Sequence, residues 1–225
     1  MLKINMIHLK KLLFSIVFLL FFSFNLYAEG NYIIINYGIS NHDVGATAGS
    51  KNADSRTSTI TTDDDDLGFI LSVGRVFEGN WGVDLMYYDL GSSSIAVDKL
   101  DFVKIDNLEY ETKTSGTITN DISGYGFGLI GASDLDSGIF GMSFYGKVGV
   151  HAWDKSGSTS LLDNNNAFAG SFYNQGIGGY AGLGVGVNIH ENISLNISYD
   201  TLGLTNDAGF DNSSSLLGAG LKVNF

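Results

Sequence analysis

The 225-residue sequence contains neither cysteine nor proline. Without cysteine there can be no disulfide framework and no lipid-modified cysteine, so the fold must depend on hydrogen bonding and burial. The absence of proline beside 30 glycines is unusual for a chain rich in turns. It suits continuous β-ladders, because proline lacks the N–H group that a ladder needs.

Basic residues are also scarce, with 12 Lys and Arg against 24 Asp and Glu. Three of the basic residues, Lys3, Lys10 and Lys11, lie in the first 28 positions, which contain no acidic residue. The rest of the chain therefore has a net charge of 9 − 24 = −15. This balance argues against a nucleic acid or an anionic surface as a partner, since phosphate binding requires clustered Lys and Arg.

A long apolar run occurs only near the N-terminus. Residues 12–24 are apolar except for Ser15 and Ser23, basic residues precede them, and the small residue Ala28 follows. This layout predicts a secretory signal peptide over residues 1–28 and a mature protein of residues 29–225. An uncleaved anchor helix is the alternative, but the run is short for a membrane span. No later segment has about 20 consecutive apolar residues.

Alternation of apolar and polar residues with a period of two dominates the remaining sequence, and this pattern indicates β-strands. In residues 181–187, for example, Ala, Leu, Val and Val alternate with glycines. The pattern predicts eight strands, over residues 31–40, 67–77, 81–90, 123–132, 140–153, 177–189, 193–202 and 213–225.

The links between these strands alternate in length. Long polar links are expected at residues 41–66, 91–122, 154–176 and 203–212, whereas the other three are short, which is typical of bacterial outer-membrane barrels. The link 91–122 could contain another hairpin and raise the count to ten strands. Both faces of 95–110 carry charge, however, and a Lys near the bilayer midplane costs roughly 2–4 kcal/mol. We therefore expect Leu100, Phe102 and Val103 to pack over the barrel mouth or in a hairpin above the membrane.

The distribution of residues over the two faces favours a membrane barrel. An eight-stranded barrel is only wide enough for side chains to fill it, so a soluble one needs an apolar interior. Here the apolar face is the one assigned to lipid, and the other face is rich in Gly, Ser, Asn, Asp and Lys. The glycines are expected to leave room for Tyr88, Tyr145 and Tyr180. Interfacial aromatic girdles are expected from Tyr32, Trp81, Tyr87, Trp153, Tyr199 and Phe225.

The segments SGYGFGLIGA, GGYAGLGVGVNI, ISLNISYD and LGAGLKVNF resemble the small outer-membrane β-barrel family that includes the OmpA transmembrane domain and the opacity proteins. The resemblance implies an all-β, eight-stranded, antiparallel up-and-down transmembrane barrel, monomeric, in a bacterial outer membrane. It also implies contact with membrane lipid and lipopolysaccharide, and with periplasmic chaperones and the barrel-assembly machinery. The final alternating series resembles the signal that this machinery reads: Leu217, Ala219, Leu221, Val223 and Phe225.

Five titratable residues have the parity of the barrel interior: Asp84, Lys147, His151, Asp200 and Lys222. Because buried charges persist only when they are paired and hydrogen-bonded, we expect Asp84 to pair with Lys147 and Asp200 with Lys222. The network would plug the barrel or gate ions. By contrast, Lys155 is expected in a solvated loop.

Other candidate sites have weaker support. The run Asp63, Asp64, Asp65 and Asp66 could hold a divalent cation, but it lacks the spaced ligands of a calcium loop. His42 beside Ser40 is the best candidate for a catalytic pair, since His190 is expected in a short turn. The glycine-rich GYGFGLIG lies within a strand, so it is no nucleotide fingerprint. No catalytic, cofactor or metal site is therefore expected.

These patterns together favour a non-enzymatic scaffold that displays four surface loops, for envelope integrity or for contact with an external ligand. A narrow passive pore for small solutes is the alternative. An enzyme that modifies lipid A is a third hypothesis, because a barrel fold alone does not determine function.

Overall fold

A computed structural model describes residues 30–43, 46–49, 59–98, 102–105, 108–111, 116–134, 140–163, 166–205 and 211–225. The predicted signal peptide, residues 1–28, lies outside these ranges. Within them, no helix is long and apolar enough to cross a membrane.

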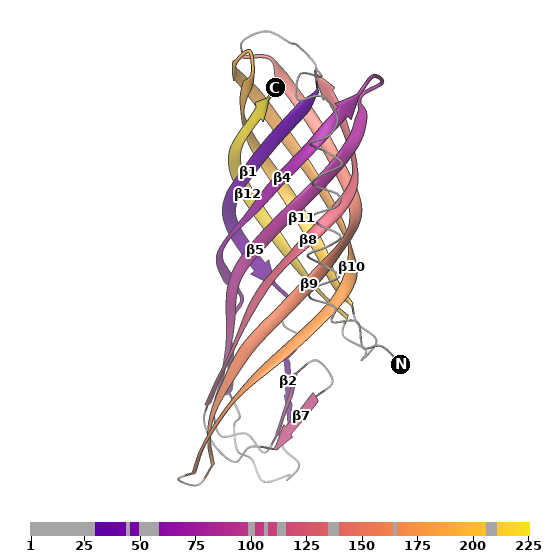
Figure 1. The fold of residues 1–225 in the computed structure, drawn as a ribbon. Helices are drawn as coiled ribbons and strands as arrows, with labels where there is room; N and C mark the ends of the chain where they lie inside the picture. Colours follow the sequence, from indigo (N-terminus) through magenta and orange to yellow (C-terminus); the bar gives the residue numbers. More distant parts are fainter. Residues whose placement is uncertain are drawn as a thin grey trace, which may run out of the picture.

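Eight antiparallel strands close into a barrel, as the alternation predicted (Figure 1). Their order around the barrel is β1, β4, β5, β8, β9, β10, β11 and β12, and β12 pairs with β1 to complete the circle. The strands are β1 (Asn31–His42), β4 (Asp65–Phe77), β5 (Trp81–Asp98), β8 (Gly116–Asp134), β9 (Met142–Asp163), β10 (Asn166–His190), β11 (Ile193–Thr205) and β12 (Asp211–Asn224).

Short connections gather at one end of the barrel, which we call the turn end; the opposite end is the loop end. At the turn end, residues 78–80 join β4 to β5, and residues 191–192 join β10 to β11. The first turn requires Gly79 and Asn80 to adopt positive φ angles of 94° and 64°. Glycine and asparagine tolerate this conformation better than other residues.

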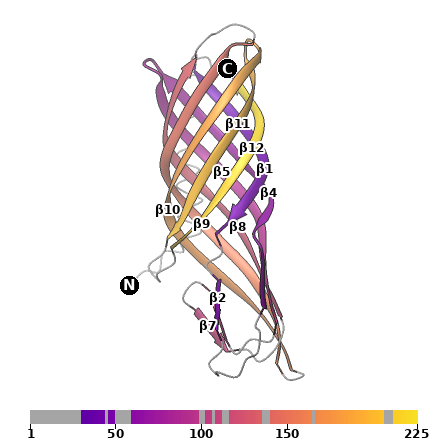
Figure 2. The same cartoon turned by 180° about the vertical axis from the view of Figure 1, so that it is seen from behind.

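Four strands are much longer than the sequence predicted. We expected residues 91–122 and 154–176 to be loops, but β5 continues to Asp98, β8 begins at Gly116, β9 continues to Asp163 and β10 begins at Asn166. The expectation was wrong because these extensions carry polar residues on both faces, so they lack the apolar alternation of a membrane strand. They form a curved sheet that continues past the barrel at the loop end (Figures 1 and 2).

Four further short strands belong to the loop end. β3 (Thr59–Asp63) pairs with the extension of β5. β2 (Ala46–Gly49), β6 (Phe102–Ile105) and β7 (Leu108–Glu111) form a separate sheet. The two strands of the expected hairpin are thus present as β6 and β7, while Leu100 lies outside the described residues.

Side chains alternate between lipid and lumen as predicted. On β1, for example, Ile39 is 58% exposed while Ser40 is fully buried. Trp81, Tyr199 and Phe225 are exposed on the barrel surface, as expected of girdle residues. Tyr32 and Trp153 were assigned wrongly to the girdles, since both are fully buried.

The lumen contains more apolar side chains than the sequence suggested. A smaller buried cluster consists of Tyr32, Ile34, Ile130 and Tyr145. A larger one, which we call the apolar plug, consists of Ile70, Met86, Tyr88, Leu90, Ile122, Trp153, Tyr180, Leu202, Leu204 and Leu216. The expectation of a polar inner face is therefore correct for only part of the barrel.

The glycines accommodate the tyrosines as predicted. A Cβ atom added to Gly124 would lie 2.4 Å from the hydroxyl of Tyr88, and one added to Gly184 would lie 2.2 Å from the ring of Tyr145. Neither distance is possible between real atoms, so a larger residue would displace the tyrosine.

Candidate functional site

The most charged part of the lumen is an ion pair between two strands that flank β10. The Nζ atom of Lys147 on β9 lies 3.0 Å from Oδ1 of Asp200 on β11, and both side chains are almost completely buried. Gly182 of β10 lies between them in the register. A Cβ atom at Gly182 would be 2.2 Å from Asp200 Oδ1, so glycine at this position allows the pair to form.

Asp84 is the third member of this charged group. It is fully buried on β5, accepts a hydrogen bond from the Tyr32 hydroxyl at 2.7 Å and one from Ser72 at 3.4 Å, and interacts electrostatically with Lys147. The ammonium of Lys147 pairs with Asp200, and its charge also acts on Asp84. The expected pairing of Asp84 with Lys147 stays a prediction.

The expected pair between Asp200 and Lys222 was wrong. Asp200 lies opposite Leu216 on β12, whereas Lys222 lies opposite Ser194, six residues farther along β11. Six residues of a strand span about 20 Å. Instead, the Lys222 ammonium lies 5.6 Å from the centre of the Tyr32 ring, a distance at which cation–π attraction acts.

Amides and hydroxyls extend the charged group across the lumen. Asn36 of β1 donates to Ser198 at 2.6 Å, and Ser198 donates to Asp200 at 2.8 Å. Asn196 donates to the side-chain oxygen of Asn36. A continuous network therefore connects β1, β9 and β11, and sequence reasoning missed its uncharged members because polar inward positions are common in such strands.

His151 also points into the lumen, as predicted, but it is held by two hydrogen bonds. Its Nε2 atom lies 2.9 Å from the Gly203 carbonyl oxygen, and its Nδ1 atom lies 2.6 Å from the Tyr88 hydroxyl. Because a carbonyl oxygen can only accept, Nε2 carries a proton and donates it to Gly203. Both ring nitrogens are thus used to fix the side chain.

The apolar plug obstructs the lumen. Trp153, Leu90, Leu202 and Leu216 are all fully buried and pack in one cluster. A conducting path needs continuous polar or water-filled space, and apolar constrictions close pores by excluding water. The side chains of the apolar plug therefore close the lumen at this level.

His42 lies near the loop end among polar groups. Its Nε2 atom is 3.1 Å from the Leu90 carbonyl oxygen, to which the Ser40 hydroxyl also donates at 2.5 Å. Nε2 therefore carries a proton and cannot accept one from Ser40. The other ring nitrogen lies 3.0 Å from Ser214, and His42 and Ser214 are both buried. This geometry gives no accessible nucleophile and base.

The acidic run 63–66 is tied into the strands by hydrogen bonds. Oδ2 of Asp66 accepts from the backbone N–H of Ser92 at 2.6 Å and from its hydroxyl at 2.9 Å, and Oδ1 accepts from the N–H of Leu67 at 2.7 Å. The backbone donors of Ser92 and Leu67 lower the pKa of Asp66. In addition, Asp65 accepts from Asn41 at 2.8 Å. Among the described residues, no group of three or more His, Asp or Glu is arranged to hold a metal ion.

The hydrogen bonds between Asp66 and Ser92 lie at a bulge in β5. The register between β5 and β8 shifts between Asp89 and Ser92, and Gly91 within the bulge has a φ of 72°. The bulge marks where β5 leaves the barrel and enters the loop-end sheet. Asp66 therefore fastens the base of that sheet to the barrel.

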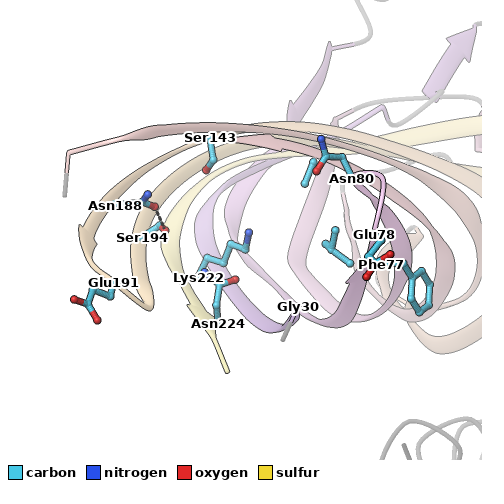
Figure 3. A pocket seen from close by; sticks show the side chains of 12 residues that line it. Gly30, Phe77, Glu78, Asn80, Ser143, Asn188, Glu191, Ser194, Lys222 and Asn224 are labelled. Atoms are coloured by element: carbon cyan, nitrogen blue, oxygen red, sulfur yellow. Dashed lines mark hydrogen bonds between the residues drawn. The ribbon is translucent and has the colours of Figure 1, made fainter. Parts of the chain in front are cut away.

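The turn end opens into a polar vestibule of about 380 Å³ (Figure 3). Lys222 extends toward the middle of this mouth, while Glu78 and Glu191 come from the turns. On its wall, Ser194 donates to Asn188 at 2.7 Å. His190 is exposed beside the same turn, where we expected it.

The loop-end sheet has a different construction from the barrel. It consists of β3 and the extensions of β5, β8, β9 and β10. Lys155, expected in a solvated loop, lies instead in β9 and is only 3% exposed. That expectation was wrong because residues 154–163 continue the strand and turn every second side chain inward.

The C-terminal alternating series lies on the outside of β12. Leu217, Leu221, Val223 and Phe225 are exposed there, and Ala219 shares their parity. These side chains are accessible from the lipid side. Their role in assembly stays a prediction.

Comparisons with known proteins give only distant structural likenesses. No family model and no curated protein matches the sequence. Among solved structures, Ail from Yersinia pestis has 18% identity and a TM-score of 0.45, with coverage of 87% of this chain and 99% of Ail. OprG from Pseudomonas aeruginosa has 16% identity and a TM-score of 0.46, with coverage of 88% and 96%. The Escherichia coli outer membrane protease OmpT has 12% identity and a TM-score of 0.45, with coverage of 87% and 97%. These likenesses do not distinguish between functions.

Proposed function

We propose that the protein is a non-enzymatic scaffold of a bacterial outer membrane that holds a rigid β-sheet outside the cell for contact with external partners. The observation that carries the proposal is the continuation of four barrel strands beyond a lumen closed by side chains. The barrel fixes the sheet, and the sheet provides the surface.

The outer face of the barrel supports the membrane location. Exposed apolar side chains cover it, whereas charged and amide side chains are inside. A closed barrel leaves no backbone hydrogen-bonding group unsatisfied in lipid. Short turns mark the periplasmic end of such barrels and longer connections the extracellular end, so the loop-end sheet faces outward. Export by the signal peptide 1–28, insertion by the assembly machinery and contact with lipopolysaccharide belong to the same proposal.

The closed lumen favours this function over a passive pore. A solute would have to displace the apolar plug and separate the buried pair of Lys147 and Asp200. Breaking a buried ion pair costs several kcal/mol. The hydrogen bonding of His42 and Ser40 likewise offers no support for a hydrolytic enzyme.

Site-specific labelling tests the display of the sheet. Because the chain has no cysteine, Ser171→Cys on β10 introduces a single thiol, and Asn80→Cys at the turn end is the matched control. We expect a membrane-impermeant maleimide to label Ser171→Cys on intact cells and Asn80→Cys only after permeabilisation. Labelling of Asn80→Cys alone on intact cells would contradict the orientation.

Conductance tests the closed lumen. Purified protein in planar bilayers is expected to give no steady channels. Leu90→Ser combined with Leu216→Ser, which makes the apolar plug polar, is the comparison variant. Stable channels from the wild-type protein would favour the pore instead.

A further inference from the structure

We infer that the edge of β10 in the loop-end sheet is a docking site for an extended segment of an external polypeptide, which binds by adding a strand. This inference deepens the proposed function and rests on it. The inference is based on the different lengths of two neighbouring strands. β10 has 25 residues, whereas β11 has 13 and therefore covers only part of it.

The free edge is defined by the strand registers. Residues 166–179 of β10 have partners on β9, but the pairing with β11 begins only at Tyr180, opposite Leu202. Fourteen consecutive residues thus have a ladder partner on one side only within the described part of the chain, and the last two of them, Gly178 and Gly179, also lie against the backbone of Gly203. At about 3.4 Å per residue this edge is about 45 Å long.

The edge lacks the features that usually prevent strand addition. Proteins protect edge strands with charged residues, proline or short length. Residues 166–179 contain no charged residue and no proline, and they include Tyr173 and Ile177, which are 53% and 71% exposed. Nothing in the composition of this strand opposes an additional partner.

The opposite edge of the same sheet is protected. It is formed by β3, which has only five residues and ends at Asp63. Asp63 places a carboxylate at this edge, and charged residues at an edge deter strand addition. One sheet therefore has a closed edge and an open edge.

The chemistry of the open edge selects a polypeptide as the occupant. Along a free strand edge, every second residue points its backbone N–H and C=O groups outward. A second extended backbone has the same spacing, so it can form hydrogen bonds along the whole edge. The mature chain has a net charge of −15 under the predicted cleavage. Long-range attraction therefore favours a segment flanked by Lys or Arg.

A second copy in the same membrane fits this edge poorly. A symmetric pair of antiparallel β10 edges needs a two-fold axis perpendicular to the strand, which would turn one barrel upside down. Two barrels inserted in the same direction cannot bring their β10 extensions together in this antiparallel arrangement. Parallel pairing of identical residues is also less stable, and the two acidic chains repel each other.

The direct test uses a synthetic peptide and the complete mature protein in detergent. The probe is a fluorescent peptide of about twelve residues with alternating Thr and Val and with Lys at both ends. Its control has the same sequence with N-methyl groups on every second residue, which removes the hydrogen bonds of one edge. We expect fluorescence anisotropy to show binding of the probe and at least about tenfold weaker binding of the control, which corresponds to about 1.4 kcal/mol.

Proline substitutions locate the binding edge. Gly170→Pro and Ser171→Pro are made separately, because adjacent N–H groups of a strand point to opposite sides and only one of the two faces β9. The variant whose substituted N–H points away from β9 is used, provided that it keeps its heat-modifiable migration on gels. We expect it to reduce peptide binding by about tenfold or more, whereas Thr61→Pro on β3 leaves binding unchanged.

The outcomes separate the two proposals. Equal binding of the N-methylated control, or an equal loss with Thr61→Pro, overturns the docking site. If Ser171→Cys is labelled on cells but no peptide binds, the display function stands and the docking inference fails. If it is not labelled, the display function itself fails. A dimer in sedimentation that the β10 proline variant abolishes makes a second copy the occupant and also overturns the inference.

Discussion

The same strands have different roles in the barrel and in the loop-end sheet. Within the barrel, every strand has a partner on both sides, apolar side chains face outward and the apolar plug closes the lumen. Beyond it, β9 and β10 carry polar residues on both faces, and β10 loses its second partner. The barrel strands are therefore paired on both sides, whereas the part of β10 in the sheet keeps backbone hydrogen-bonding groups without a ladder partner.

This difference predicts how each region responds to change. A substitution in the barrel disturbs a closed and tightly packed system, in which the neighbours have no room to adjust. A substitution in the sheet affects partly solvated groups that water can replace.

The largest effect is expected at the C-terminus. Deleting Phe225 should strongly reduce the amount of assembled barrel in cells, because the assembly machinery would no longer read the series that ends there. The stability of protein refolded in vitro should fall by only about 1.5–3 kcal/mol, the value of one apolar side chain. The measurement compares heat-modifiable protein in outer-membrane fractions with urea midpoints in detergent.

Trp81→Ala is the matched control for Phe225. It removes another exposed aromatic side chain at the turn end, whose ring centre lies 4.9 Å from that of Phe77. It leaves the alternating C-terminal residues intact. If both changes reduce assembly equally, Phe225 acts only as a girdle residue and the assembly-signal prediction is wrong.

A smaller but still severe effect is expected from Lys147→Ala. The substitution leaves Asp84 and Asp200 buried without a cation, and removal of one partner from a buried pair costs roughly 3–5 kcal/mol. Asp84→Asn should be much milder, because it retains an acceptor for Tyr32 and leaves the neutral pair of Lys147 and Asp200. Urea midpoints of the two variants test this order, and equal midpoints would show that the three groups do not act together.

The barrel itself was largely predictable from the sequence. Period-two alternation gave the eight strands and placed Asp84, Lys147, His151 and Asp200 inside, because a membrane barrel separates its two faces strictly. The partner of Asp200 was not predictable. Strand tilt and stagger decide which inward residues of different strands meet, and a single sequence does not specify them.

The loop-end sheet was missed for a different reason. Residues 154–163 and 166–176 have similar polarity on both faces, so the alternation that reveals a half-buried strand is weak there. The apolar plug was visible only as scattered inward residues such as Leu90 and Leu202. It becomes recognisable once the barrel closes and brings these residues together.

A moderate, local effect is expected where the sheet joins the barrel. Backbone donors lower the pKa of Asp66 below its ordinary value of 3.8, so its bonds to Ser92 and Leu67 stabilise the folded state above about pH 4. That stabilisation is lost as the pH falls through the lowered pKa. The amide resonance of Ser92 should therefore titrate below pH 3.8.

Asp66→Asn provides the control for this titration. It should abolish the pH response of the Ser92 amide while the barrel midpoint in urea stays nearly unchanged. A large loss of barrel stability in Asp66→Asn would show that the sheet and the barrel unfold together.

The smallest effect is expected at Tyr173, within the sheet. Partial burial, reinforced by the 2.5 Å hydrogen bond that its hydroxyl donates to Asp154, raises the pKa of Tyr173 to about 12. Because the folded pKa is raised, the protonated phenol stabilises the fold below about pH 10, and this contribution disappears as the pH rises through 12. Asp154→Asn should bring the pKa of Tyr173 back toward 10, as followed by NMR of isotope-labelled tyrosine, with Tyr173→Phe to assign the resonance.

Since the side chain of Tyr173 is 53% exposed, solvent screens its interaction with Asp154 and the urea midpoint of the barrel should not move. A clear decrease of that midpoint in Asp154→Asn would mean that the outer face of the sheet supports the barrel, which contradicts the separation of the two regions.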